Sequence, residues 1–131
     1  MGCKMNMKRV LGVGLPLLAL LSPLALPASA HHSHAMYDSE TEVTLVGTIT
    51  EYHWVNPHTW IYLEVEGVDG QTREWVIEGG GPGTLTRRGW SGNTFTPGER
   101  VTAKIYPIMD GSSGGLLGIV IKESGEEFDG N

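Results

Sequence analysis

The sequence contains a single cysteine, Cys3, among its 131 residues. One cysteine forms no intramolecular disulfide, and its place near the start leaves the rest of the chain without a thiol nucleophile or a thiolate ligand. The chain also lacks a P-loop pattern, so nucleotide hydrolysis is not expected. We do not expect an enzyme, and any metal site must use histidine, methionine, carboxylate or amine ligands.

Basic residues are scarce as well, and the first nine positions hold three of the nine, Lys4, Lys8 and Arg9. An apolar run follows from Val10 to Leu26, and Ala28 and Ala30 occupy the positions of a small-residue cleavage site. This order is typical of a secretory signal peptide. We therefore predict cleavage between Ala30 and His31 and a periplasmic or secreted bacterial protein. Prolines interrupt the apolar run and Cys3 precedes it, which disfavours a membrane or lipid anchor.

The mature chain, residues 31–131, would keep six of the nine basic residues against all 15 acidic ones, a formal net charge of −9. A surface this acidic repels phosphate backbones, so nucleic acid is not an expected partner. No apolar run long enough to cross a membrane remains after signal cleavage. A chain of about 100 residues fits one small domain that can fold without a disulfide.

Alternating apolar and polar residues predict strands over most of the mature chain. The first stretch, Glu42 to Trp54, shifts phase after Ile49, which predicts a β-bulge in one long strand, eased by Gly47. Three more strands are expected over Thr59–Gly67, Thr72–Gly80 and Leu116–Glu123, and the stretch Phe95–Met109 resumes strand character after the Pro97-Gly98 turn.

The segments between these strands complete the predicted architecture. Gly79–Trp90 is too rich in glycine for a strand, and Leu85–Trp90 within it suits one short helix or turn. Asp110–Gly115 has the composition of a flexible loop. The order predicts an all-β fold, a small five-stranded OB-like Greek-key barrel, with a small β-sandwich as the alternative. The domain layout is then a histidine-rich segment at 31–41, the barrel at 42–123 and an acidic flexible tail at 124–131.

Several short motifs occur in a fixed order along the mature chain. They are HHS at His31, YD at Tyr37, VTLVGTI at Val43, W-x-N-P-H-x-W at Trp54, EW-x-x-E at Glu74, GW at Gly89 and PGERV at Pro97. With this set the chain resembles a family of short exported bacterial proteins that is catalogued as a domain of unknown function. The resemblance implies export and a compact β domain, and it implies no activity.

Histidines form the most distinctive cluster, because His31, His32 and His34 lie within four positions. Cleavage before His31 would give this residue an α-amine beside its imidazole, two nitrogens that can chelate one ion. His58 follows the Asn56-Pro57 turn, so we expect it at the barrel rim. Folding of the terminus over this rim would combine His31, His32 and His58 in a nitrogen-rich set that suits Cu(II). His53 is expected to point to the opposite face from its neighbour Trp54 and need not converge on His58.

Other ligand sets are also compatible with the sequence. Zn(II) would add Asp38 or Glu78 as an oxygen ligand. Cu(I) would use the thioether of Met36 or Met109, with a tryptophan face such as that of Trp54 nearby. A copper site with an open position would give a third class of function, an oxidase or oxygenase.

Two interpretations without a specific metal site stand beside these. Terminal histidines bind Cu(II) or Ni(II) even in a disordered tail, and such binding would carry no function. The second interpretation is a metal-free module that binds a ligand or an envelope protein partner through a tryptophan-rich rim, using Trp60, Trp90 and Arg88. Arg87 and Arg88 are expected to pair with the acidic surface.

Overall fold

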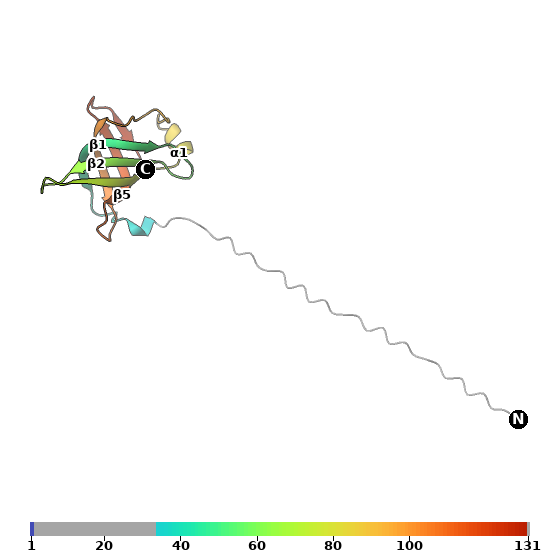
Figure 1. The fold of residues 1–131 in the computed structure, drawn as a ribbon. Coiled ribbons are helices and arrows are strands. Elements are labelled where there is room, and N and C mark those ends of the chain that lie inside the picture. Colours follow the sequence, from blue (N-terminus) through green and yellow to red (C-terminus); the bar gives the residue numbers. More distant parts are fainter. Residues whose placement is uncertain (2–33, 131) are drawn as a thin grey trace. The chain divides into compact units, whose positions relative to one another are not determined.

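The computed structural model describes Met1 and residues 34–130. Six strands and two short helices make up this part of the chain (Figure 1). In order they are η1 (His34–Met36), β1 (Val43–His53), β2 (Trp60–Glu66), β3 (Thr72–Glu78), α1 (Pro82–Thr86), β4 (Arg100–Pro107), β5 (Gly114–Lys122) and β6 (Glu127–Asp129).

The predicted signal peptide and its cleavage position lie outside the described residues, apart from Met1. Neither of the two helices found within residues 34–130 has the length and the apolar character needed to cross a membrane.

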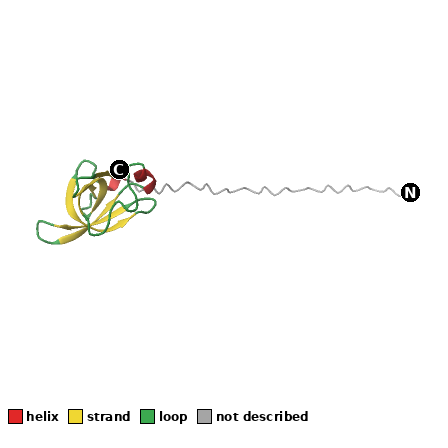
Figure 2. Ribbon diagram, turned by 90° about the horizontal axis from the view of Figure 1, so that it is seen from above, coloured by secondary structure: helices red, strands yellow, loops and turns green. Residues whose placement is uncertain are grey.

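Strand pairing closes the sheet into a barrel (Figure 2). The sheet order is β3-β2-β1-β4-β5-β6, and β3 also pairs in parallel with β5 through Val76–Gly114, Ile77–Gly115 and Glu78–Leu116. The first five strands therefore enclose one core, with β6 added at the edge of β5. This closure confirms the predicted OB-like barrel over the β-sandwich.

The predicted bulge lies in β1. Ile49 pairs with Leu63 and Glu51 pairs with Tyr62, so Thr50 is the additional residue. Before the bulge the core-facing residues have odd numbers, as Leu45 and Ile49 do. After it they have even numbers, as Tyr52 does. Without the bulge, both halves of this strand could not face the same core.

Gly47 was predicted to ease a bend in β1, but the structure gives a steric reason for glycine at this position. A Cβ atom at this position would collide with the carbonyl oxygen of Glu64 on β2 and would press against Leu63 and Val65. The missing side chain therefore allows the close approach of β1 and β2.

The loop predicted over 110–115 is shorter than expected, because β5 begins at Gly114. A Cβ atom on Gly115 would lie 2.6 Å from Ile105 Cδ1 and 2.8 Å from the carbonyl oxygen of Tyr106. Two consecutive glycines therefore let β5 reach β3 and β4 at the point where the barrel closes.

The short helix lies upstream of its predicted position, at Pro82–Thr86 instead of within 85–90. Pro82 stands in its first turn, where the absent N–H costs no hydrogen bond. Leu85 projects from this helix into the core and is completely buried. A turn with Gly89 at φ +87° then leads to Trp90.

The expected flexible tail at 124–131 differs from the structure, since Glu127–Asp129 forms β6 against β5. The ring of Phe128 packs 5.7 Å from Trp90 and 5.3 Å from Phe95, centroid to centroid. This ring contact and the strand pairing anchor a segment whose acidic composition suggested fraying.

Candidate functional site

Glu78, the last residue of β3, is a buried carboxylate on the outer face of the barrel. It is the register partner of Trp60, and the next pair, Ile61 and Ile77, lies in the core. Because neighbouring side chains on a strand alternate between faces, Trp60 and Glu78 point away from the core. Glu78 is nevertheless only 6% exposed. A carboxylate with so little water around it requires hydrogen-bonding partners.

The first partner, Tyr37, comes from the segment before β1. This residue forms an isolated bridge with Ile108, and backbone hydrogen bonds join Met109 N–H to Met36 O and Asp38 N–H to Pro107 O. The segment is thereby held beside the end of β4, and the buried Tyr37 hydroxyl donates to Glu78 Oε2. Burial, followed by the hydrogen bond to Glu78 and its negative charge, raises the pKa of Tyr37 above its ordinary range.

The second partner, His58, is positioned by its neighbour in the sequence. Thr59 is 1% exposed, its hydroxyl and its N–H both donate to Gly80 O, and its own carbonyl accepts from Gly79 N–H. These bonds tie the start of β2 to the segment directly after β3. His58 Nδ1 consequently lies 3.0 Å from Glu78 Oε1, with 30% of the His58 side chain exposed. We call Tyr37, His58 and Glu78 the Glu78 cluster.

Two cavities meet at this cluster. A small one of about 140 Å³ is lined by Pro57, His58, Trp60 and Glu78. The second, of about 380 Å³, is named the Trp60 groove and is lined by Met36, Tyr37, Trp60, Val76, Glu78, Ile108 and residues 112–114. Trp60 and Glu78 line both cavities, so the carboxylate of Glu78 is shared between them.

The predicted metal ligands are only partly brought together. His58 and Glu78 are in contact, and Met36 lines the Trp60 groove beside Glu78. His31 and His32 lie outside the described residues. Within residues 34–130, no group of three or more histidine, cysteine, aspartate or glutamate side chains is arranged to hold a metal ion.

The remaining candidate ligands lie in other surroundings. Asp38 is half-buried and its Oδ1 accepts the N–H of Glu40, an arrangement that makes a local turn. Trp54 lies against Gly92 and the ring of Tyr52. His53 has its own carboxylate, with Nε2 2.7 Å from Glu51 Oε2, and its ring lies 4.9 Å from that of Tyr62.

Of the two tryptophans proposed for the ligand-binding rim, Trp60 borders a cavity and Trp90 does not. Trp90 is 2% exposed and packs in the core against Phe95 and Phe128, so it is a core residue and not a rim residue. Arg88 Nη1 lies 3.0 Å from Asp129 Oδ1, which confirms the predicted pairing of this arginine with the acidic surface.

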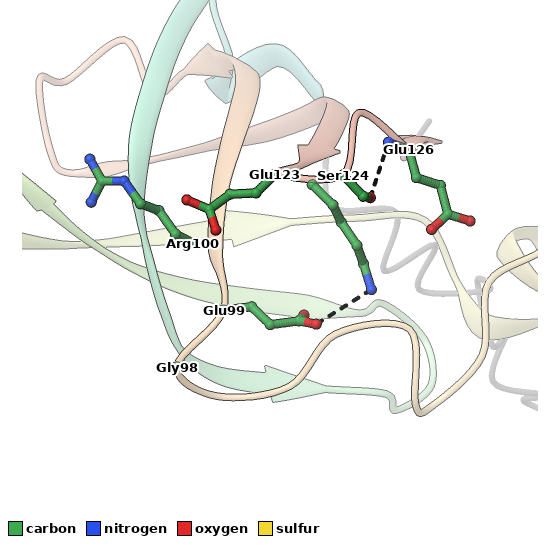
Figure 3. Close-up of a pocket in the computed structure, with 7 residues that line it drawn as sticks. Gly98, Glu99, Arg100, Glu123, Ser124 and Glu126 are labelled. Carbon is green, nitrogen blue, oxygen red and sulfur yellow. Dashed lines mark hydrogen bonds and ion pairs between the residues drawn. The ribbon is translucent and has the colours of Figure 1, made fainter.

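A different surface depression lies where β4 begins and β5 ends, lined by residues 98–100, 122–124 and 126 (Figure 3). Lys122 Nζ lies 3.5 Å from Glu99 Oε1, and it also lies 5.2 Å and 5.5 Å from the ring centroids of Phe95 and Phe128. In this depression, which we call the Lys122 depression, the ammonium group of Lys122 contacts both a carboxylate and aromatic rings of the same chain.

Tyr37 is the site residue that sequence reasoning did not select. It appeared only as part of a YD motif, and 41 positions separate it from Glu78.

Residues 111–115 fit the G-x-S-x-G pattern of nucleophile elbows. That pattern requires a strand-to-helix turn, whereas Gly114 here begins β5, so the pattern carries no catalytic argument.

The fold and the site define a small, closed OB-like β-barrel with a tyrosine–glutamate–histidine cluster on its outer face. The chain belongs to the family of unknown function DUF6152, whose model matches residues 19–118. No curated protein and no solved structure matches the chain.

Proposed function

We propose that this protein is an exported metal-binding protein that uses His58 and the mature N-terminus to hold a divalent transition-metal ion, with Cu(II) as the first choice. Its role would be metal handling, as a carrier, buffer or delivery protein. The observation that carries the proposal is the contact between His58 Nδ1 and the buried carboxylate of Glu78.

This contact resembles the outer shell of many metal sites. A histidine that ligates a metal commonly directs its other ring nitrogen to a carboxylate, which fixes the tautomer and the ring orientation. At 3.0 Å, Glu78 Oε1 favours a proton on Nδ1 of His58, because two lone pairs would repel each other. Nε2 is then the ring nitrogen with metal-ligand character. Tyr37 holds the other carboxylate oxygen and so restricts rotation of Glu78.

The remaining ligands would come from His31 and His32. Tyr37 follows His31 by six positions, and six residues span at most about 20 Å. Because the Tyr37 hydroxyl already contacts Glu78, this length of chain would allow the terminal amine and imidazoles to reach His58. An amine and imidazoles form a set that suits Cu(II).

The alternative ions fit the described contacts less well. Glu78 contacts Tyr37 and His58 through its two oxygens, which supports an orienting role for it over that of an oxygen ligand for Zn(II). Met36 borders the groove beside Glu78, so a Cu(I) form with a thioether ligand is the secondary option.

Titration with Cu(II), read by electron paramagnetic resonance, tests this proposal on the exported, processed protein. Replacement of His58 by alanine should weaken binding at least about tenfold, and Glu78→Gln should weaken it by about tenfold to a hundredfold. His53→Ala is the matched control, because His53 also pairs with a glutamate but lies apart from the Glu78 cluster. One extra residue before His31 should abolish the tight signal.

Equal binding by the His58→Ala and His53→Ala proteins would contradict the proposal. Tight binding in the His58→Ala protein that is lost on extension of the terminus would mean that the terminal histidines bind the ion alone. The metal-free ligand-binding module would then be the better interpretation, supported by the two cavities that border Trp60.

A further inference from the structure

We propose that the Trp60 groove binds a small organic cation, an ammonium group on a short apolar body. The charged end would lie at Glu78 and the apolar body along Trp60. This inference does not rest on the metal site, and it gives a ligand class to the metal-free alternative.

Charge is the first argument. Among the described residues that line the groove, Glu78 is the only carboxylate, and none is a lysine or arginine. Its partners are the phenol of Tyr37 and the imidazole of His58. A carboxylate that is 6% exposed is best stabilised by a full positive charge close to it.

The shape and the lining of the groove supply the second argument. Met36, Val76 and Ile108 give it apolar sides, and Trp60 gives it an aromatic side. Aromatic faces attract ammonium groups, and the attraction grows where water is excluded. The volume of about 380 Å³ falls in the lower part of the range for small-molecule sites. A carboxylate, an aromatic face and apolar sides together match an organic cation better than a neutral or anionic ligand.

The Lys122 depression provides an internal comparison (Figure 3). There, an ammonium group lies between the carboxylate of Glu99 and the rings of Phe95 and Phe128. The Trp60 groove has the same two elements, a carboxylate and an aromatic side chain, but its described lining contributes no cation of its own. A ligand would therefore occupy in the groove the position that Lys122 occupies in the depression.

The test uses 2-phenylethylammonium as the probe and 2-phenylethanol as its neutral control, added to ¹⁵N-labelled processed protein after removal of metal with a chelator. The charged probe should shift the indole N–H of Trp60 and the amides of Met36 and Ser113, whereas the alcohol should not. Glu78→Gln should weaken binding at least about tenfold, because it replaces a charge-assisted contact by a neutral one. Glu99→Gln, which alters the other depression, should leave these shifts unchanged.

Further variants separate this proposal from the metal proposal. The protein with one extra residue before His31 should retain binding of the ammonium probe while losing tight metal binding. Trp60→Leu keeps Glu78 and should weaken binding of the probe about fivefold, and it decides the matter if the Glu78→Gln protein does not fold. Equal shifts with the alcohol, unchanged affinity in Glu78→Gln and Trp60→Leu, or shifts confined to other surfaces would each overturn the proposal.

Discussion

Trp60 and Glu78 are register partners on the antiparallel strands β2 and β3, and they share the outer face of the barrel. Cross-strand partners of this kind have adjacent side chains, so the indole and the carboxylate form a common border between the small cavity and the Trp60 groove. Glu78 contacts His58 on one oxygen and Tyr37 on the other. Any substitution that alters this carboxylate is therefore expected to affect both cavities.

Tyr37→Phe should destabilise the protein by about 1.5–3 kcal/mol, because it removes a hydrogen bond to a buried charged group. Tyr52→Phe is the matched control, since its hydroxyl donates to the neutral carbonyl of Ser91 at 3.0 Å. The control should cost about 1 kcal/mol. Urea unfolding followed by circular dichroism gives both values. Equal losses in the two variants would show that Glu78 gains no special stabilisation from Tyr37.

Stability should fall in alkaline solution. Burial raises the pKa of both Tyr37 and Tyr52 above the value of about 10 that tyrosine has in an unfolded chain. The folded state thus retains protons that the unfolded state has already released. This contribution is fully present below the unfolded pKa and is lost as the pH rises through the folded one, by up to about 1.4 kcal/mol per pH unit for each tyrosine.

Unfolding free energies measured between pH 8 and pH 11 check this dependence. The Tyr37→Phe protein should lose stability less steeply than the unsubstituted protein over the alkaline part of this window. Identical slopes for the two proteins would contradict a raised pKa at Tyr37.

The sequence was sufficient to predict features that depend on local patterns. The phase shift between Ile49 and Tyr52 predicted the bulge because side chains alternate along a strand, and the register confirms it. The strand order predicted an OB-like barrel, which the parallel contact of β3 with β5 completes. These conclusions depend on neighbouring residues, which a linear sequence displays directly.

Features that depend on distant partners were missed. Tyr37 and Glu78 lie 41 positions apart, and no local pattern links them. The predicted rim position of Trp90 is wrong, because a tryptophan in a glycine-rich segment gives no sign of which face it occupies. In the structure Trp90 packs beside Phe128 of β6. The acidic residues around Phe128 predicted a flexible tail, although the Phe128 ring packs against the domain.

Gly115→Ala tests the closure of the barrel. The added methyl group would meet Ile105 Cδ1 at 2.6 Å and the backbone oxygen of Tyr106 at 2.8 Å, so we expect a loss of about 1–3 kcal/mol from overpacking. Gly83→Ala is the control, because a Cβ there has no neighbour within 4 Å and alanine favours the helix. The control should leave the unfolding midpoint unchanged or slightly raised. A Gly115→Ala protein as stable as the control would show that β5 can move away from β4 at no cost.

Phe128→Ala tests whether the end of the chain belongs to the folded domain. Its ring contacts those of Trp90 and Phe95 at centroid distances of 5.7 Å and 5.3 Å, and Lys122 Nζ lies 5.5 Å from it. Removing a half-buried aromatic side chain with these contacts should cost about 2–4 kcal/mol. Glu126→Ala, two residues away and exposed, should change stability by less than about 0.5 kcal/mol. Thermal and urea unfolding of both variants would separate an anchored strand from a frayed tail, since a frayed tail would give the same small change in each.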